Sequence, residues 1–296
     1  MLLSACGEEE SPRPPAAVAG QGASGGTGGD SAAGTSGTGG TAGTGATTAG
    51  GGGVDCNAFV VTGDRTAVEG ATWTYQSTDD GVAYSLEGIL FAPAGDGPFP
   101  GVVINHGKDG TVWRYSALIA NEMRSWGMVA IGTMLAHASD MEDMGNLPDG
   151  ADGRSPENVL RVKKAYDLLT CVPVDMARVA VHGHSMGGFV TGQFLGTHPG
   201  LCLAASHTAG GTSMGPNATE MSVAQQIITP YQLHHGDADV VVQYEYDQAL
   251  ADILEASGTP HEFYTYPGFS HEDMTDDPTM FERVRAWYTT YGVLTP

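Results

Sequence analysis

The chain has 296 residues, of which 41% are hydrophobic and 16% are charged, and 12 Lys+Arg against 34 Asp+Glu give a formal net charge of -22. This composition excludes a disordered polyelectrolyte, a collagen-like fibre and a basic nucleic-acid-binding protein. No unbroken apolar stretch reaches the length of about 18 residues that indicates a membrane-spanning helix.

The first 53 residues differ in composition from the rest of the chain. They contain 17 of the 44 glycines, and 35 of the 38 residues from 16 to 53 are Gly, Ala, Ser or Thr. A segment with so few large apolar side chains cannot bury a core. We therefore expect a disordered tether over residues 16–53, a signal remnant and charged start over residues 1–15, and one large domain over residues 54–296.

The sequence Leu-Ser-Ala-Cys-Gly over residues 3–7 resembles the lipobox of bacterial lipoproteins. The resemblance implies that Cys6 is lipidated and that the protein is held in the bacterial cell envelope or lies outside the cell. The basic and apolar parts of a signal are missing before Cys6, so we expect the encoded start to lie upstream of Met1. The alternative is an unmodified Cys6 in an ordinary N-terminus.

Cys56, Cys171 and Cys202 remain, and an odd number of cysteines leaves one unpaired. Cys171 closes an expected helix and Cys202 opens an expected strand, so we expect a disulfide between these two in an oxidising compartment. The alternative is three buried thiols. No Cys-x-x-Cys or Cys/His spacing indicates a zinc site, and we expect no metal.

From residue 81 onward, short β-rich runs alternate with amphipathic segments of helical length. This alternation predicts an α/β fold with a mostly parallel central sheet covered by helices on both faces. We expect strands at residues 82–91, 101–105, 128–133, 178–182, 201–206, 231–234 and 262–266. We expect helices at residues 113–126, 155–169, 186–198, 243–257 and 278–291.

Local features add detail to two of these helices. Ser155 is a suitable cap for the helix at 155–169, and Pro156 is allowed in its first turn. For the helix at 113–126, the candidates for inward-facing side chains are Val112, just before it, and Leu118, Ile119 and Met123.

The pentapeptide Gly-His-Ser-Met-Gly at residues 183–187 lies between an expected strand and an expected helix. This is the G-x-S-x-G nucleophile elbow in the strand-turn-helix context that it requires. The glycines are needed because the turn is too sharp for side chains two positions before and two positions after the serine. The motif predicts Ser185 as a nucleophile, with a glycine-rich turn around a structural serine as the alternative.

A serine hydroxyl needs a base within hydrogen-bond reach, and the base needs a group that orients it. In this strand order both follow the serine, the acid first and the histidine second. His-Gly-Asp-Ala-Asp at residues 235–239 follows one expected strand, and Gly-Phe-Ser-His at residues 268–271 follows the next. The candidates are therefore Asp237 or Asp239 for the acid and His271 for the base.

With these motifs, residues 80 to 291 resemble the α/β-hydrolase superfamily, specifically its dienelactone-hydrolase-like and polyesterase/cutinase-like serine hydrolases. The resemblance implies that Asp239, the fifth position of His-Gly-x-x-Asp-x-x-Val, is the acid and that His271 is the base. It also implies an oxyanion hole made by the backbone N–H groups of Met186 and Lys108. Dienelactone hydrolases proper carry cysteine at the nucleophile position, so Ser185 favours esters more generally.

We therefore expect a serine carboxylic-ester hydrolase that forms an acyl-enzyme and needs no metal or organic cofactor. Only residues 209–226 are available where related lipases insert a cap, so we expect no large cap domain. The alternatives are an extracellular polyesterase or cutinase-like hydrolase and a catalytically silent, surface-tethered binding module.

The expected partner is a small-molecule or polymeric ester. The acidity of residues 54–296 disfavours nucleic acid, and we expect membrane contact only through a lipid on Cys6. An acidic insertion at residues 135–154 contains Asp140, Glu142 and Asp143. These three could form a weak cation site, and the alternative is a solvated acidic loop.

Overall fold

The computed structural model describes residues 53–79, 82–108, 111–136, 153–215 and 217–296. Cys6, the segment 1–15, the tether up to residue 52 and the acidic residues Asp140, Glu142 and Asp143 lie outside these ranges. Within them, no helix combines the length and apolar character needed to cross a bilayer.

The described residues form a nine-stranded sheet in the order β1-β2-β3-β5-β4-β6-β7-β8-β9. The first three strands are antiparallel to their neighbours, and every pair from β5 to β9 is parallel. The strands are β1 (Val60–Thr62), β2 (Ala71–Asp79), β3 (Val82–Phe91), β4 (Phe99–Asn105), β5 (Val129–Thr133), β6 (Val174–His184), β7 (Ala204–Thr208), β8 (Tyr231–Gly236) and β9 (His261–Tyr266).

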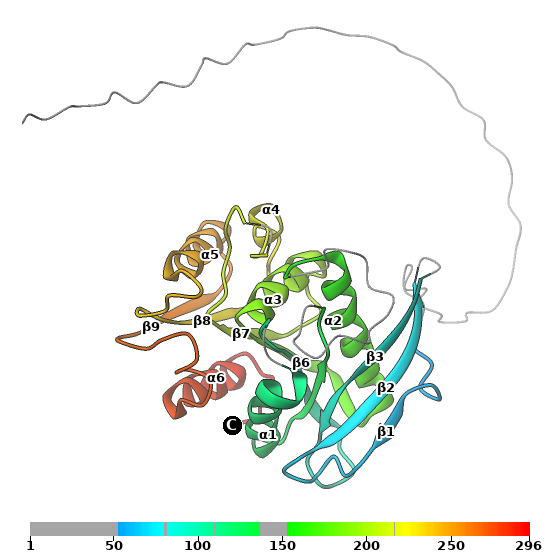
Figure 1. Ribbon diagram of the computed structural model, residues 1–296. Helices are drawn as coiled ribbons and strands as arrows, with labels where there is room; N and C mark the ends of the chain where they lie inside the picture. The colour runs from blue at the N-terminus through cyan, green and yellow to red at the C-terminus, as the bar shows by residue number, and fades with distance from the viewer. Residues whose placement is uncertain (1–52, 80–81, 109–110, 137–152, 216) are drawn as a thin grey trace, which may run out of the picture. The chain divides into compact units, whose positions relative to one another are not determined.

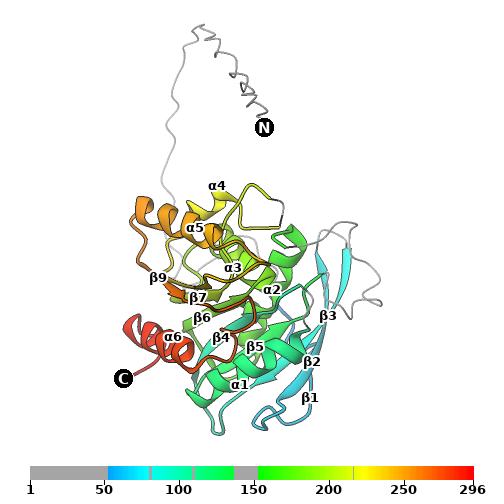
Figure 2. The ribbon, with the colours of Figure 1, turned by 60° about the vertical axis from the view of Figure 1, so that its left-hand side comes forward.

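Helices cover both faces of this sheet (Figures 1 and 2). On one face lie α2 (Pro156–Leu168), α3 (Met186–Thr197) and α5 (Tyr244–Ser257), and on the other lie α1 (Ala117–Ser125) and α6 (Pro278–Thr290). Successive side chains of a strand point to opposite faces, so Leu90 enters the first core while Ile89 and Phe91 enter the second. The predicted α/β fold with a mostly parallel sheet is confirmed.

Between β7 and β8 the described residues hold one short helix, α4 (Met221–Ala224), in place of a cap domain. The predicted start of α2 is also present, because Ser155 Oγ accepts the Asn158 N–H at 3.3 Å and Pro156 occupies the first turn. α6 begins in the same way, with the Asp277 side chain accepting the Met280 N–H at 2.8 Å.

The expected helix at 113–126 is divided into one wide turn, η1 (Val112–Ser116), and α1. Ile119 and Met123 are buried as expected, but Leu118 is 48% exposed. Consecutive residues of a helix are turned by about 100° around its axis, so the side chain before Ile119 points away from the core. The prediction that Leu118 faces inward is wrong.

The expected strand at 201–206 lies instead at Ala204–Thr208. Gly200, with φ +81°, forms a turn that delays the start of the strand. The strand continues through polar residues because each finds a buried partner: Ser206 Oγ lies 2.7 Å from His182 Nδ1, and Thr208 Oγ1 lies 2.7 Å from His184 Nδ1. The pattern of hydrophobic residues in a sequence does not reveal strand residues that are held by such polar side-chain pairs.

The disulfide joins Cys56 to Cys171, and the expected Cys171–Cys202 bond is absent. Cys202 is a buried thiol packed in the core beneath α2 and α3. The segment before β1, which contains Cys56, lies beside the short helix η3 (Leu169–Cys171), which follows α2. This long-range approach has no local signal in the sequence, and the prediction of a Cys171–Cys202 bond is wrong.

Because the disulfide closes a loop of 115 residues, it restricts the unfolded chain strongly. We expect Cys56→Ser to lower the free energy of unfolding by about 2–4 kcal/mol. Urea denaturation with and without reductant measures this change. Reductant should destabilise the wild-type protein and leave the variant unaffected, and equal reductant sensitivity in both would contradict the assignment.

Candidate active site

Ser185 lies in the tight turn between β6 and α3. Its backbone has φ 53° and ψ -122°, a left-handed conformation that is costly for a residue with a side chain. Two sets of backbone hydrogen bonds hold the turn. The Ser185 N–H donates to the Thr208 carbonyl at 2.9 Å, and the Ser185 carbonyl accepts the N–H groups of Gly188 at 2.8 Å and Phe189 at 3.2 Å.

The two glycines of the motif permit a close approach of backbone segments. A Cβ atom on Gly183 would lie 2.2 Å from the Gly187 carbonyl oxygen, and one on Gly187 would lie 2.1 Å from the Asn105 carbonyl oxygen. Both separations are far below van der Waals contact. The glycines therefore let β4, β6 and α3 meet closely enough to present Ser185 at the end of the sheet.

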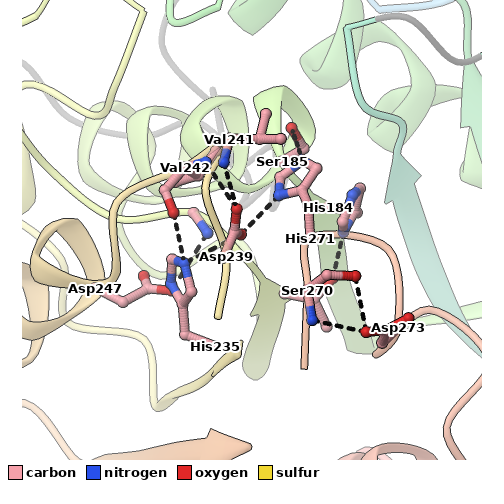
Figure 3. A network of polar contacts seen from close by, with 12 residues as sticks. His184, Ser185, His235, Asp239, Val241, Val242, Asp247, Ser270, His271 and Asp273 are labelled. Carbon is pink, nitrogen blue, oxygen red and sulfur yellow. Dashed lines mark hydrogen bonds and ion pairs between the residues drawn. The ribbon is translucent and has the colours of Figure 1, made fainter. Parts of the chain in front are cut away.

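Ser185, His271 and Asp239 form a continuous hydrogen-bonded chain (Figure 3). His271 Nε2 lies 2.8 Å from Ser185 Oγ, and His271 Nδ1 lies 2.7 Å from Asp239 Oδ2. The histidine is 8% exposed and the Asp239 side chain is fully buried. The structure thus brings together three residues that are 54 and then 32 positions apart in the sequence.

Asp239 is held as a carboxylate. Its Oδ1 accepts the N–H groups of Val241 at 2.8 Å and Val242 at 2.9 Å, while its Oδ2 faces His271. Burial alone would raise the pKa of Asp239, but hydrogen bonds from His235, His271 and the two backbone groups outweigh it and hold the pKa well below its ordinary value. An ionised acid at this position can stabilise a protonated His271.

Asp237, the alternative acid, serves a different contact. It is exposed, and its Oδ1 accepts the Gly268 N–H at 2.6 Å. The Ala238 N–H also donates to the Phe269 carbonyl at 3.1 Å, so these contacts join the acid loop to the loop that carries His271. On the other side, the N–H and hydroxyl of Ser270 both donate to Asp273 Oδ2 at 2.7 Å.

The uncharged ring of His184 packs beside His271, the candidate base. Its ring lies between Tyr115, with ring centroids 4.4 Å apart, and His271, with centroids 4.8 Å apart. Burial is the main cause that lowers the pKa of His184, and repulsion from His271 is the second; together they hold this pKa well below 6.5. Its Nδ1 is paired with Thr208 Oγ1 at 2.7 Å, which fixes the orientation of the ring.

Within the described ranges, one group of side chains has the spacing to hold a metal ion. His184, His271 and Glu272 each offer an atom, and these atoms lie within 4.8 Å of one another. Both nitrogens of His271 already contact Ser185 and Asp239, so an ion bound there would displace one of those contacts. The contacts of His271 with Ser185 and Asp239 therefore account for the position of its ring.

A cavity of about 790 Å³ opens over Ser185 at the carboxyl ends of the parallel strands, where ligands bind in open α/β sheets. Both residues expected to form the oxyanion hole, Met186 and Lys108, line it together with Gly107. Met186 is the first residue of α3, so its N–H has no partner within the helix and lies at the positive end of the helix dipole. Apolar walls come from Leu118, Phe189, Val241 and Val242.

Residues 86–288 match the dienelactone hydrolase family. The chain belongs to this family. It is a hydrolase with the α/β-hydrolase fold, as the sequence resemblance implies, and the matched segment contains every residue of the site described above. No curated protein matches the chain.

Solved structures agree with the fold of this dienelactone hydrolase family member. A protein assigned as a dienelactone hydrolase from Klebsiella pneumoniae superposes with a TM-score of 0.60 at 16% identity, covering 74% of this chain and 99% of that one. An S-formylglutathione hydrolase from Agrobacterium tumefaciens superposes with a TM-score of 0.59 at 13% identity, covering 78% of this chain and 99% of that one. A thermophilic esterase from Thermogutta terrifontis superposes with a TM-score of 0.57 at 17% identity, covering 75% of this chain and 96% of that one.

Proposed function

We propose that the protein is a serine carboxylic-ester hydrolase that works through an acyl-enzyme. The observation that carries the proposal is the chain of contacts from Ser185 Oγ through His271 to Asp239, built on a strained nucleophile elbow. An activated serine, a base and an orienting acid in this order are the requirements of nucleophilic acyl transfer. The family membership supports hydrolysis as the overall reaction.

In the proposed reaction, His271 Nε2 takes the proton from Ser185 as Oγ attacks the ester carbonyl. Asp239 stabilises the imidazolium, and the N–H groups of Met186 and Lys108 bind the oxyanion. His271 then donates its proton to the leaving alcohol, which leaves an acyl group on Ser185. In the second half, His271 takes a proton from a water molecule whose oxygen attacks the acyl carbonyl. It then returns this proton to Ser185 Oγ as the bond between Oγ and the acyl group breaks, which releases the carboxylic acid and restores the serine. These steps need no metal or organic cofactor.

The substrate class can be tested with a panel of p-nitrophenyl esters from acetate to palmitate. The apolar side chains of Leu118, Phe189 and Val242 around the cavity favour esters with an aliphatic acyl group. We expect hydrolysis of at least the shorter members, with kcat/KM depending on chain length. Purified folded protein that hydrolyses none of them would contradict the proposal.

A second candidate, polyesterase activity, is favoured by exposed apolar side chains beside the cavity. Val241 and Leu118 line the cavity and are 68% and 48% exposed, and Val240, which precedes Val241 in the chain, is 95% exposed. Such side chains suit adsorption to a hydrophobic polymer surface.

To separate this candidate from small-ester hydrolysis, Val240→Ser should be compared with the wild-type protein on a polyester film and on p-nitrophenyl butyrate. For a polyesterase, release of soluble acids from the film should fall severalfold while butyrate hydrolysis is retained. Wild-type protein that releases no acid from the film contradicts the candidate.

Attachment to a bacterial cell envelope remains a proposal that rests on the lipobox-like residues 3–7. Mass spectrometry of the native protein tests it directly. A diacylglyceryl group on Cys6 is the expected result, and an unmodified Cys6 would contradict it.

A further inference from the structure

A second histidine, His235, lies on the opposite side of Asp239 from His271 (Figure 3). It is the penultimate residue of β8, and its ring is fully buried. His235 Nε2 lies 3.3 Å from Asp239 Oδ2, the same oxygen that faces His271, and 3.1 Å from the Val242 carbonyl. On the other side of the ring, Nδ1 lies 2.7 Å from Asp247 Oδ2 in α5.

Both ring nitrogens of His235 therefore face acceptors. Nδ1 meets the carboxylate of Asp247, and Nε2 meets the carboxylate of Asp239 and a backbone carbonyl. Asp247 is itself an acceptor, since it receives the Gly210 N–H at 3.2 Å and pairs with His207 through its other oxygen. A neutral imidazole can donate from only one nitrogen, so satisfying both sides requires the doubly protonated ring.

We propose that His235 is a positioning residue of the hydrolytic site, a buried imidazolium that shares the carboxylate of Asp239 with His271 and favours the neutral, base form of His271. This inference rests on the proposed ester hydrolysis. His235 is not itself among the residues that line the cavity, and the group of the proposed hydrogen-bonded chain that it contacts is Asp239, so it acts through Asp239.

The electrostatic reason is the separation of the two rings. His235 Nε2 and His271 Nδ1 contact the same oxygen, which places them no more than about 6 Å apart. When His271 is protonated, two cations must share one carboxylate, and this raises the free energy of the protonated form. The acid limb of the kcat/KM profile should therefore lie at lower pH with His235 present than without it.

Burial alone would lower the pKa of His235, but its contacts with Asp239 and Asp247 outweigh burial and raise it to about 10. The ring of His235 therefore stays charged at neutral pH.

Other titratable groups face the two rings from several elements of the fold. Asp247 and Tyr244 face His235 from α5, and His207 reaches it through Asp247. His184 packs against His271 from the end of β6, and Glu272 follows it in its own loop. Replacement of His235 removes its charge beside Asp239 and one of the hydrogen bonds to Asp247, while Asp247 keeps its contacts with His207 and the Gly210 N–H.

His235→Gln tests the proposal, because the amide can still donate toward Asp239 but carries no charge. Loss of the cation should move the acid limb of the kcat/KM profile to higher pH, by up to about one pH unit. An acid limb that stays within experimental error of the wild-type position in an active, folded variant would overturn the role of the charge.

His234→Gln is the matched control. His234 is the preceding residue of β8, is equally buried, and bonds to Tyr266 and Gln232 instead of Asp239. Burial holds the pKa of His234 well below 6.5, so its replacement by Gln removes no charge. The control should leave the acid limb in place, and an equal shift in both variants would indicate general repacking and overturn the proposal.

A second measurement does not depend on activity or on the folding of a variant. Nitrogen NMR of the histidine rings in the wild-type protein should show both nitrogens of His235 protonated from about pH 5 to about pH 9. A neutral His235 ring in this range would overturn the proposal even if the enzyme hydrolyses esters. Failure of the wild-type protein to hydrolyse any ester would instead refute the proposed function and leave the charge state of His235 measurable.

Discussion

Ser185→Ala should lower kcat for p-nitrophenyl butyrate by at least about 10⁴-fold. The substitution removes the oxygen that contacts His271 and leaves the cavity walls, the elbow glycines and Asp239 in place. Any remaining turnover would come from substrate binding and the oxyanion hole alone. Steady-state kinetics with enough enzyme to detect slow hydrolysis measure the effect.

The control for this variant is its unfolding transition. Ser185 has a positive φ that alanine tolerates no better, so the stability of the variant should stay close to that of the wild-type protein. Retention of more than about a tenth of the wild-type kcat in folded Ser185→Ala protein would mean that another residue is the nucleophile.

Asp239→Asn should be nearly as damaging, with a loss in kcat of about 10⁴-fold. An amide at this position presents an N–H or a neutral oxygen to His271, so it neither fixes the required tautomer nor stabilises the imidazolium. The pH–rate profile and kcat on a soluble nitrophenyl ester measure the effect.

Asp237→Asn provides a matched comparison two residues away. Asp237 is exposed, and an asparagine there can still accept the Gly268 N–H through its amide oxygen. We expect its kcat to stay within about tenfold of the wild-type value, since only a loop contact is weakened. The opposite ranking of the two variants would identify Asp237 as the acid and contradict the contacts seen at Asp239.

The parts of the site that could be predicted from sequence are those set by short-range constraints and by the order of strands. The pentapeptide at 183–187 is recognisable because a strand, a sharp turn and a helix must follow one another there. The loops of Asp239 and His271 follow successive parallel strands, whose carboxyl ends meet at one edge of the sheet.

The features that were missed depend on contacts between distant segments. The partner of Cys171 could not be chosen, because Cys56 reaches it only through the return of the N-terminal segment over the fold. β2 is an exception: it was not predicted although it carries a local signal, since Ala71, Trp73 and Tyr75 are buried and alternate with exposed residues. Nothing in the sequence pairs His235 with Asp247, because β8 and α5 meet there only after the fold has formed.

The central claim is that Ser185 is the nucleophile of a hydrogen-bonded Ser–His–Asp unit. Treatment of the purified protein with a fluorophosphonate, followed by peptide mass spectrometry, tests it most directly. We predict a single covalent adduct on Ser185 in the wild-type protein, and its loss in Asp239→Asn and in denatured protein. Folded wild-type protein that is labelled at another residue, or not labelled, would contradict the claim and favour a silent binding module on a hydrolase scaffold.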